Sequence, residues 1–361
     1  MRLRVVEDVF SQPRSCFPLL LRKSMSMRVL NRASKMLLTA VLLGSPSAWA
    51  QGENYDIYLF AGQSNADGRG EISEIPGLTG AGNVGDVSGR TLASYAGQQP
   101  DHRIYFSNPG ISDDPADNPE YVSGWQTLEP GYSIEPGFRD TLTDSQGSLN
   151  TDTFGPEVSF ASTIREATGT TNNVGIIKVT DGGTSLAVDW RAPGSNDADD
   201  EGGLHYALLV NQATAALEAL AAEGNTGTIR GLVWHQGESD TGRTSRLNAY
   251  QARFENFVAQ LQADLGLEVL PTVIGELAPS REVPAFTAVQ EAIDEQNELI
   301  SLTSSDNLVT TDGTHFDTFS QLQLGERFAQ DLAQLVVIPE PATAAVLCLP
   351  LVALASRRRR G

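Results

Sequence analysis

YLFAGQSNADGRG, residues 58–70, begins as an apolar run and changes character at Gly62, after which Gln63, Ser64 and Asn65 follow in a row. A short apolar run of this kind is typical of a strand buried inside a sheet. Glycine, serine and asparagine also end many strands simply because they suit turns. The segment therefore predicts a strand with Ser64 at its end, and the rest of the chain must decide whether this serine is a nucleophile.

Strand-like and helix-like runs alternate along the rest of the chain. Short apolar runs predict five strands, at residues 55–61, 174–179, 229–234, 269–274 and 307–310. Longer runs predict five helices, at residues 156–164, 204–222, 245–264, 284–297 and 318–335. Such alternation favours parallel pairing through right-handed crossovers. The expected fold class is α/β, as a three-layer α/β/α sandwich with a mainly parallel five-stranded sheet.

One stretch, residues 51–338, has the length of a single large α/β domain or two small ones. No repeat or low-complexity linker divides it. Residues 66–153 interrupt the alternation, because they are rich in Gly, Asp, Pro and Ser. We expect this segment to be a loop-rich insertion with room for a hairpin.

Polar residues and glycine follow four of the predicted strands. The segments are GQSN at 62–65, TDGGTS at 180–185, HQGESD at 235–240 and DGTH at 312–315. In parallel α/β sheets, ligands bind beyond the carboxyl ends of the strands, which lie along one edge. We therefore expect a functional site at this edge, built from all four segments.

The residue types in these segments suit ester hydrolysis. That reaction needs a hydroxyl nucleophile, a base, a group that holds the tautomer of the base, and donors for the oxyanion. Asp312 stands three residues before His315, so a turn can bring its carboxylate to one ring nitrogen. The other ring nitrogen then faces the edge where Ser64 is expected. His235 is the alternative base, but it directly follows a buried strand and is the weaker candidate.

The same segments resemble, in order and spacing, motifs of the SGNH hydrolases of the sialate O-acetylesterase and acetyl xylan esterase group. The matching motifs are GQSN, DGGTSL, WHQGESD and DGTHF, and FGPEVSF at 154–160 and SLAVDWRAP at 185–193 are also similar. The resemblance extends over most of residues 54–336. It implies a flavodoxin-like sheet and an esterase that needs no cofactor.

The resemblance also implies roles for particular residues. The catalytic triad would consist of Ser64, Asp312 and His315. The oxyanion hole would combine the backbone N–H of Ser64, the backbone N–H of Gly183 or Gly182, and the side-chain amide of Gln236. Glycine lets the backbone approach the tetrahedral oxygen, and a side-chain amide supplies a neutral donor.

Five residues near the motifs are candidate sugar contacts: Gln63, Asn65, Trp190, Arg191 and Glu238. Packing in the core explains Trp190 and Arg191 equally well, and Glu238 could instead brace its own loop. A metal site is not indicated, because the acidic residues lack the regular spacing of oxygen ligands in a calcium loop.

The two ends of the chain are similar to sorting signals. Residues 1–50 close with a basic segment, a short apolar run and the letters AWA, which predict a secretory signal peptide; residues 1–24 can be an over-long start. Residues 339–361 contain Pro-Glu-Pro, an apolar run that is short for a membrane helix, and four arginines. This order resembles a PEP-CTERM tail. It implies transient residence in the inner membrane, an exosortase-type sorting protease as partner, and release to the envelope or the extracellular matrix.

Charge and cysteine content narrow the function further. Residues 51–338 hold 13 basic and 42 acidic residues, a net charge of −29, and Lys178 is their single lysine. Such a surface argues against nucleic acid and anionic membranes as partners. Cys16 and Cys348 lie in the two sorting segments, so the residues between those segments hold no disulfide, thiol nucleophile or Cys-bound zinc.

The sequence therefore predicts a secreted, metal-independent serine esterase that removes acetyl groups from acetylated sugars or polysaccharides through an acyl-enzyme. Two alternatives stay open. One is a surface carbohydrate-binding protein that has lost activity on the same fold, and the other is a lipase or thioesterase of the SGNH type. The intact motifs argue against the first, and the polar, acidic segment 66–153 argues against the second.

Overall fold

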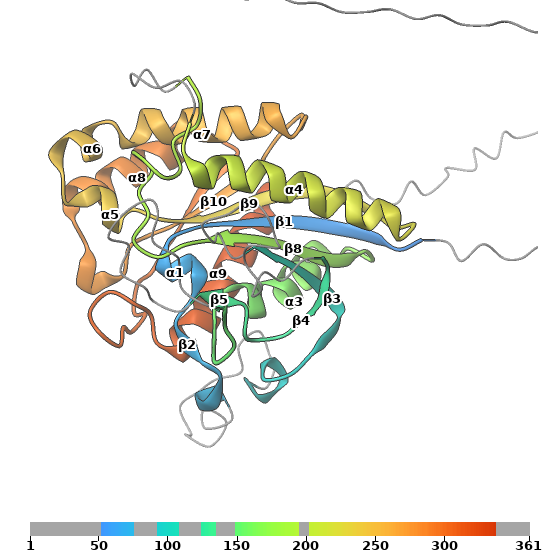
Figure 1. The fold of residues 1–361 in the computed structure, drawn as a ribbon. Coiled ribbons are helices and arrows are strands. Elements are labelled where there is room, and N and C mark those ends of the chain that lie inside the picture. The colour runs from blue at the N-terminus through green and yellow to red at the C-terminus, as the bar shows by residue number, and fades with distance from the viewer. Residues whose placement is uncertain (1–51, 76–91, 108–123, 135–148, 195–201, 337–361) are drawn as a thin grey trace, which may run out of the picture. The chain divides into compact units, whose positions relative to one another are not determined.

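A seven-stranded sheet is the centre of the structure, a computed structural model that describes residues 52–75, 92–107, 124–134, 149–194 and 202–336 (Figure 1). The strands lie in the order β11, β10, β9, β1, β8, β3 and β4, and all pairs are parallel except β3 with β4. Their bounds are β1 Asn54–Gly62, β3 Gln99–Ser107, β4 Gln126–Leu128, β8 Asn173–Thr180, β9 Thr226–His235, β10 Thr272–Gly275 and β11 Ile300–Thr303. Two small antiparallel pairs join β2 Gly70–Glu71 to β7 Thr153–Phe154 and β5 Ser133–Ile134 to β6 Leu149–Asn150.

The predicted sorting segments, 1–50 and 339–361, lie outside the described residues, as do parts of the predicted insertion. The signal peptide and the tail therefore stay predictions. Within the described ranges, no helix combines the length and the apolar character that crossing a membrane requires.

The α/β class and the mainly parallel sheet are confirmed, but the prediction of five strands is wrong. Segment 66–153, predicted as a loop-rich insertion with room for a hairpin, supplies β3 and β4, which pair antiparallel with each other, and β3 also pairs in parallel with β8. The first half of β3 reads QPDHR, so it lacks the apolar pattern that marks a strand. The strand predicted at 307–310 contributes only the bridge between Thr310 and Phe316. The last strand is β11, whose sequence ISLT is short and half polar.

Strand β1 lies between β8 and β9 and carries the candidate nucleophile at its end. Its side chains alternate between two cores: Ile57 and Leu59 pack on one face of the sheet, and Tyr58 and Phe60 on the other. All four side chains are 0 % exposed. A strand that is buried on both faces reads as a continuous apolar run, which is why the sequence alone reveals it.

Helices cover both faces of this sheet (Figure 1). α4, α7 and α8 pack on one face, and α3 and α9 on the other. The helix bounds are α1 Ser64–Asp67, α3 Glu157–Thr168, α4 Leu204–Ala222, α5 Glu238–Thr241, α6 Thr244–Asn248, α7 Tyr250–Asp264, α8 Pro284–Gln296 and α9 Thr318–Leu335. Each predicted helix is present, although the one expected at 245–264 is divided into α6 and α7 at Ala249.

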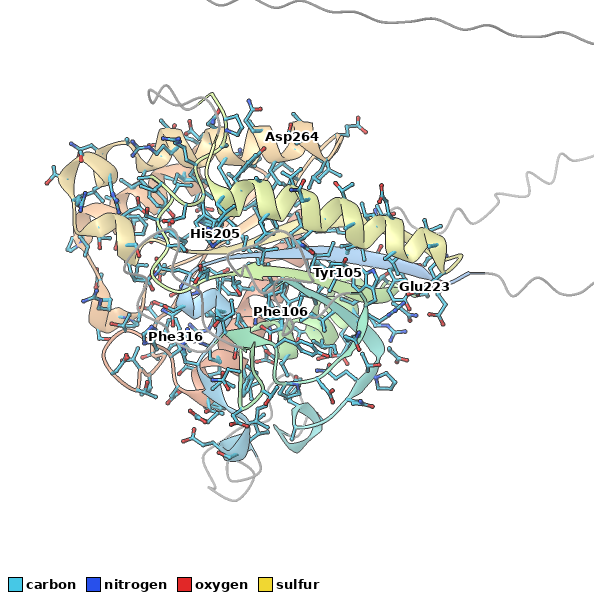
Figure 2. The ribbon with its side chains drawn as sticks, in the orientation of Figure 1. Tyr105, Phe106, His205, Glu223, Asp264 and Phe316 are labelled. Carbon is cyan, nitrogen blue, oxygen red and sulfur yellow. The ribbon has the colours of Figure 1, made fainter. Side chains whose placement is uncertain are left out.

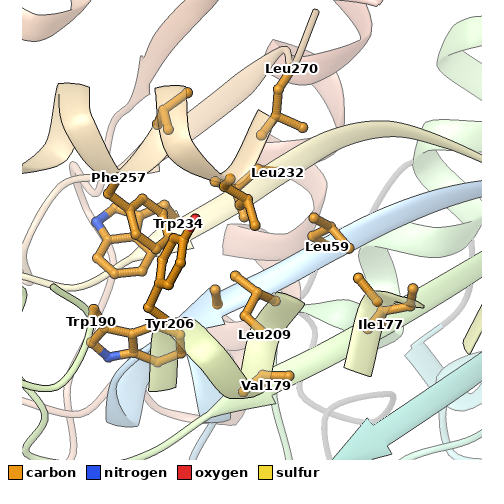
Figure 3. Close-up of a cluster of buried hydrophobic side chains, with 14 of the residues drawn as sticks. Leu59, Ile177, Val179, Trp190, Tyr206, Leu209, Leu232, Trp234, Phe257 and Leu270 are labelled. Atoms are coloured by element: carbon orange, nitrogen blue, oxygen red, sulfur yellow. The ribbon is translucent and has the colours of Figure 1, made fainter. Parts of the chain in front are cut away.

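A cluster of aromatic rings fills the space between the sheet and helices α4 and α7 (Figure 3). The ring of Trp234 on β9 lies 5.3 Å from that of Trp190 and 4.7 Å from that of Phe257. Tyr206 on α4 meets Phe257 edge-on at 5.9 Å. A fully buried side chain of this size stabilises the fold by about 1.5–3 kcal/mol. The cluster therefore holds β9, and the loop that follows it, firmly against two helices.

Lys178 on β8 is buried beneath α1. It is 0 % exposed, and its Nζ donates to the carbonyl oxygens of Asp67 and Tyr132, each at 2.7 Å, and to Glu157 Oε2 at 2.9 Å. The other carboxylate oxygen of Glu157 accepts the N–H of Gly155 at 3.1 Å. Burial raises the pKa of Glu157, while the charge and the hydrogen bond of Lys178 act against that rise. This ammonium group ties β8 to α3 and to the end of α1, the helix that begins with the candidate nucleophile.

Replacing Lys178 by methionine should destabilise the protein strongly, because the Glu157 carboxylate would stay buried without its cation. Breaking one side of a buried ion pair costs about 3–5 kcal/mol. Urea unfolding followed by circular dichroism measures the free energy of unfolding. The double variant Lys178→Met with Glu157→Gln removes both charges and should recover most of the loss. A single variant as stable as the wild type would contradict this account of the cluster.

Candidate active site

Strand β1 ends in a turn that requires glycine at position 62. Gly62 has a φ of 142°, and a Cβ atom there would lie 2.2 Å from the carbonyl oxygen of His235. The same carbonyl accepts the N–H of Gln63 at 3.0 Å. The chain then enters α1, whose first residue is Ser64, with 5 % of its surface exposed. The turn thus places Ser64 at the carboxyl edge of the sheet, beside the end of β9.

The loop after β11 brings Asp312 and His315 to this serine. Asp312 Oδ1 accepts the backbone N–H groups of Thr314 at 2.9 Å and of His315 at 2.8 Å, which closes a tight turn. Asp312 Oδ2 lies 2.7 Å from His315 Nδ1, and His315 Nε2 lies 2.9 Å from Ser64 Oγ. The three residues predicted as a triad therefore lie within hydrogen-bonding distance of one another, in the order carboxylate, imidazole, hydroxyl.

The state of the imidazole follows from these contacts. When Nδ1–H donates to Asp312, the lone pair of Nε2 is free to accept the hydroxyl of Ser64. The side chain of His315 is 28 % exposed and that of Asp312 is 55 % exposed. Partial burial acts to raise the pKa of Asp312, but hydrogen bonds from the backbone and ring of His315 and from Thr314 outweigh it and lower the pKa to about 2. Asp312 is therefore an anion at neutral pH.

Asn65 holds the histidine loop from below. Its Nδ2 donates to the carbonyl oxygen of Thr314 at 3.0 Å, and its Oδ1 accepts the N–H of Phe316 at 3.2 Å, so it bonds the backbone on both sides of His315. Figure 2 shows Phe316 close to α1. Nδ2 also donates to Glu238 Oε1 at 2.9 Å, and Asn65 is 0 % exposed. The prediction of Asn65 as a sugar contact is therefore wrong, because its whole amide is used inside the protein.

Gln236 and Gln63 are bonded to each other beneath the surface, with exposures of 0 % and 3 %. Gln236 Nε2 donates to Gln63 Oε1 at 3.2 Å, to Thr184 O at 3.1 Å and to Asp240 Oδ2 at 2.7 Å. An amide nitrogen carries two hydrogens, so none remains for an oxyanion. Gln63 Oε1 also accepts the N–H of Ser239 at 3.3 Å. The structure therefore corrects two predictions, because Gln236 and Gln63 brace the loop after β9 and are not placed to meet a substrate.

Backbone donors are available beside the serine. The N–H groups of Ser64, Gly182 and Gly183 have no acceptor within the described ranges of the chain. A Cβ atom at position 182 would lie 3.6 Å from Ser64 Cβ, whereas one at 183 would meet nothing within 4 Å. Of the two glycines that the sequence could not separate, Gly182 is the one that lies against Ser64.

The other predicted sugar contacts have different surroundings. Trp190 is 0 % exposed and donates Nε1–H to Thr184 Oγ1 at 2.9 Å, so it is a core residue and its prediction as a sugar contact is wrong. Arg191 is half-buried, and its carbonyl oxygen accepts the N–H of Gly203 at 2.6 Å, just before α4. Its contact with sugar stays a prediction. Glu238 is buried beside Asn65, burial raises its pKa, and its Oε2 has no hydrogen-bond partner among the described residues.

His235, the alternative base, points away from the serine. It is 0 % exposed, its Nε2 lies 3.0 Å from the carbonyl oxygen of Glu276, and its ring packs against Phe316 and Phe328, each at 5.8 Å. Burial lowers the pKa of His235 to about 4, although the hydrogen bond to Glu276 opposes this. A neutral, enclosed ring of this kind supports the core and leaves His315 as the candidate base.

Sequence reasoning did not place two further polar side chains, His205 and Arg69, at this edge. His205, at the start of α4, has its Nε2 2.9 Å from Asp181 Oδ2 (Figure 2). Arg69 also lies beside Gly182, where an added Cβ atom would be 3.5 Å from Arg69 Nη2 and 3.6 Å from Ser64 Cβ. Neither belongs to a recognisable spacing, and only the fold brings them here. Across the ranges that the structure describes, no group of His, Cys, Asp and Glu is arranged to hold a metal ion.

Comparisons with known proteins agree with this fold. The family model described as "carbohydrate esterase, sialic acid-specific acetylesterase" matches residues 54–334. A protein of known structure from Arabidopsis thaliana is 18 % identical, over 78 % of this chain and 99 % of its own, with a TM-score of 0.55. A carbohydrate acetylesterase from Xanthomonas citri is 19 % identical, over 78 % of this chain and 56 % of its own, with a TM-score of 0.49. NanS is 16 % identical, over 79 % of this chain and 98 % of its own, with a TM-score of 0.49. No curated protein sequence matches.

The family match extends from β1 to α9 and includes all four loops of the candidate site. The protein is therefore a carboxylic ester hydrolase. Within that class, the chain belongs to the carbohydrate esterase family of sialic acid-specific acetylesterases.

Replacing His235 by glutamine should flatten the dependence of stability on pH. The buried ring has a pKa of about 4, whereas a histidine in the unfolded chain titrates near 6.5. As the pH falls from about 7.5 to about 5, the unfolded chain takes up a proton that the folded protein excludes, which lowers stability by about 2 kcal/mol. Urea unfolding at both pH values should show that the variant loses about 2 kcal/mol less than the wild type. Equal losses in the two proteins would contradict a neutral, buried His235.

Proposed function

We propose that this protein is a serine carbohydrate O-acetylesterase in which Ser64, His315 and Asp312 form the catalytic triad. The observation that carries the proposal is the pair of contacts at His315, with Nε2 2.9 Å from Ser64 Oγ and Nδ1 2.7 Å from Asp312 Oδ2. Membership of a carbohydrate esterase family supports an acetylated sugar as the substrate.

The geometry suggests a two-step reaction. In the first step, Ser64 Oγ attacks the acetyl carbonyl carbon while its proton passes to His315 Nε2. The tetrahedral intermediate collapses as the bond to the sugar oxygen breaks, and that oxygen takes the proton from His315. In the second step, water gives a proton to His315 and attacks the acetyl group on Ser64. Acetate leaves and the proton returns to Ser64 Oγ, so the enzyme is regenerated without a cofactor.

Two further parts of the protein support this reaction. The carboxylate of Asp312 holds the ring of His315 in one tautomer and stabilises the imidazolium that forms in each step. The backbone N–H groups of Ser64 and of Gly182 or Gly183 have no acceptors in the described part of the chain, and we propose that they bind the carbonyl oxygen as it becomes negative.

The two ends of the chain support a location outside the cytoplasm. Residues 1–50 have the order of a secretory signal peptide, and residues 339–361 that of a PEP-CTERM tail. We therefore propose that the esterase is exported, is held transiently in the inner membrane by its tail, and is processed by an exosortase-type protease. Its acetylated substrate would then be a sugar or polysaccharide of the envelope or the extracellular matrix.

Ser64→Ala should remove esterase activity and leave the fold unchanged, because the hydroxyl makes no packing contact that alanine would lose. Turnover of 4-nitrophenyl acetate and acetate release from a panel of acetylated glycans should fall by more than about 10³-fold. Thermal unfolding serves as the control and should be close to that of the wild type. A folded variant that keeps several per cent of wild-type turnover would rule out Ser64 as the nucleophile.

Asp312→Asn should lower kcat by about 10- to 100-fold. In serine proteases, replacing the buried aspartate at this position lowers kcat by about 10⁴-fold. The side chain of Asp312 is more than half exposed, so water weakens its effect on His315. Asp317→Asn is a matched control, because Asp317 lies two residues beyond His315 and only caps α9 by accepting the N–H of Ser320 at 2.8 Å. If the control lost as much kcat as Asp312→Asn, Asp312 would not be the third member of the triad.

A further inference from the structure

Arg69 follows α1 directly, and one nitrogen of its guanidinium group is anchored in the protein. Nη1 contacts the carboxylate of Asp67 and donates to the carbonyl oxygens of Gly68 and Ile134, both at 2.9 Å. The side chain of Arg69 is 13 % exposed. Because three acceptors surround one end of a planar group, the whole guanidinium plane is held in a single orientation.

The carboxylate that anchors Arg69 is itself firmly held. Asp67 is the last residue of α1 and is 0 % exposed. It accepts the hydroxyl of Thr180 at 3.0 Å, and its two oxygens accept the N–H of Ile134 at 3.1 Å and 3.0 Å. A donor fixed in this way needs little reorganisation when charge develops beside it.

The other edge of the guanidinium, formed by Nε and Nη2, has no hydrogen-bond partner in the part of the chain that the structure describes. This edge and the candidate nucleophile border the same small space. A methyl group on the α-carbon of Gly182 would lie 3.5 Å from Arg69 Nη2 and 3.6 Å from Ser64 Cβ. The glycine leaves this space open, so a reacting group at Ser64 can come within reach of the arginine.

The side-chain donor expected for the oxyanion is already in use. Gln236 Nε2 has three acceptors inside the protein and is 0 % exposed, so both of its hydrogens are engaged. We propose that Arg69 supplies the side-chain donor of the oxyanion hole, through its free Nε–Nη2 edge. This inference rests on the proposed function, since it assumes an acetyl ester that reacts at Ser64.

The electrostatics of the site favour a charged donor. Residues 51–338 carry a net charge of −29, and the carboxylate of Asp312 lies 2.7 Å from His315 Nδ1. Further negative charge on the carbonyl oxygen is therefore unfavourable unless a cation compensates for it. Arg69 transfers no proton and forms no bond; it donates hydrogen bonds that strengthen as the oxygen becomes negative, and it acts on kcat for that reason.

The test compares Arg69→Gln with the wild type on 4-nitrophenyl acetate, a substrate without a sugar. Loss of one oxyanion donor should lower kcat by about 10²-fold, with KM changed by less than about threefold. In Arg69→Ala, guanidinium chloride at concentrations that do not unfold the protein should restore part of kcat. Gly182→Ala should also lower kcat, because its methyl group would fill the space between Arg69 and Ser64 at ordinary contact distances.

Arg230→Gln is the matched control. Arg230 Nε also pairs with a fully buried carboxylate, Asp56 Oδ1, at 2.8 Å, but this pair lies near the start of β1, at the opposite edge of the sheet. Its loss should change thermal stability about as much as the loss of Arg69 does and should leave kcat unchanged. The comparison separates the structural share of an arginine–aspartate pair from an effect on the reaction.

Three results would overturn the proposal. The first is an Arg69→Gln enzyme that keeps kcat within about threefold of the wild type. The second is a change confined to KM for acetylated glycans, which would make Arg69 a sugar contact. The third is a loss of kcat in Arg69→Gln that Arg230→Gln shows to the same extent at an equal loss of thermal stability, together with no recovery of Arg69→Ala in guanidinium. The proposed function itself fails by a different measurement, the persistence of activity in Ser64→Ala.

Discussion

A single buried amide, that of Asn65, joins the two ends of the fold at the candidate active site. Its oxygen and nitrogen bond the backbone at Phe316 and Thr314, the neighbours of His315 on either side. Ser64 begins α1 just after the central strand, whereas His315 lies in a loop that pairs with no strand of the sheet in the described part of the chain. Asn65, the residue that directly follows the serine, therefore helps to hold the two side chains at their 2.9 Å contact. Because the amide is fully enclosed, both bonds are shielded from water and the loop has little freedom to drift.

Below the reacting atoms lies a layer of polar side chains that are satisfied by one another. Lys178 bonds to Glu157 and to the carbonyl oxygen of Asp67, and Gln236 bonds to Gln63 and Asp240. Buried polar groups destabilise a protein when they are left unpaired, so such a layer tolerates few arrangements. In this protein it gives a rigid support for α1 and for the loop after β9. Several motif residues that look like substrate ligands in the sequence belong to this support.

The need of buried polar groups for hydrogen-bond partners shows how Arg69 differs from the residues around it. Most polar atoms of the supporting layer have partners within the protein, but the guanidinium is anchored along one side and open along the other, toward Gly182 and Ser64. In a strongly acidic protein, a fixed cation at this position offsets the negative charge of the nearby carboxylates. Because Gln236 bonds within the protein, the proposed side-chain donor for the oxyanion is the neighbouring Arg69.

Local patterns in the sequence were sufficient for the α/β class, the helices and the central strands. Buried strands such as β1 read as apolar runs, helices such as α4 read as longer Ala- and Leu-rich runs, and the turn Asp312–His315 depends on only four residues. The choice of Ser64, Asp312 and His315 could be made from sequence for the same reason. Strands β4 and β11 and the place of β3 in the main sheet were not predicted, because their pairing depends on neighbours distant in the chain and their own residues are half polar.

What only the tertiary structure decided is which side of each motif faces the substrate space. Gln236 and Asn65 are amides in the motifs, and their spacing does not tell whether an amide faces the substrate or bonds within the protein. Gln236 bonds to Asp240 and Thr184, and Asn65 bonds to Thr314, so both amides bond within the protein. Trp190 likewise joins the core because Trp234 and Phe257 surround it. The sequence by itself determined the fold class and indicated Ser64, Asp312 and His315 as the candidate reacting groups, since both follow from short-range patterns. The tertiary structure decided the roles of the surrounding polar residues, because hydrogen-bond saturation and burial arise only when segments far apart in the chain meet.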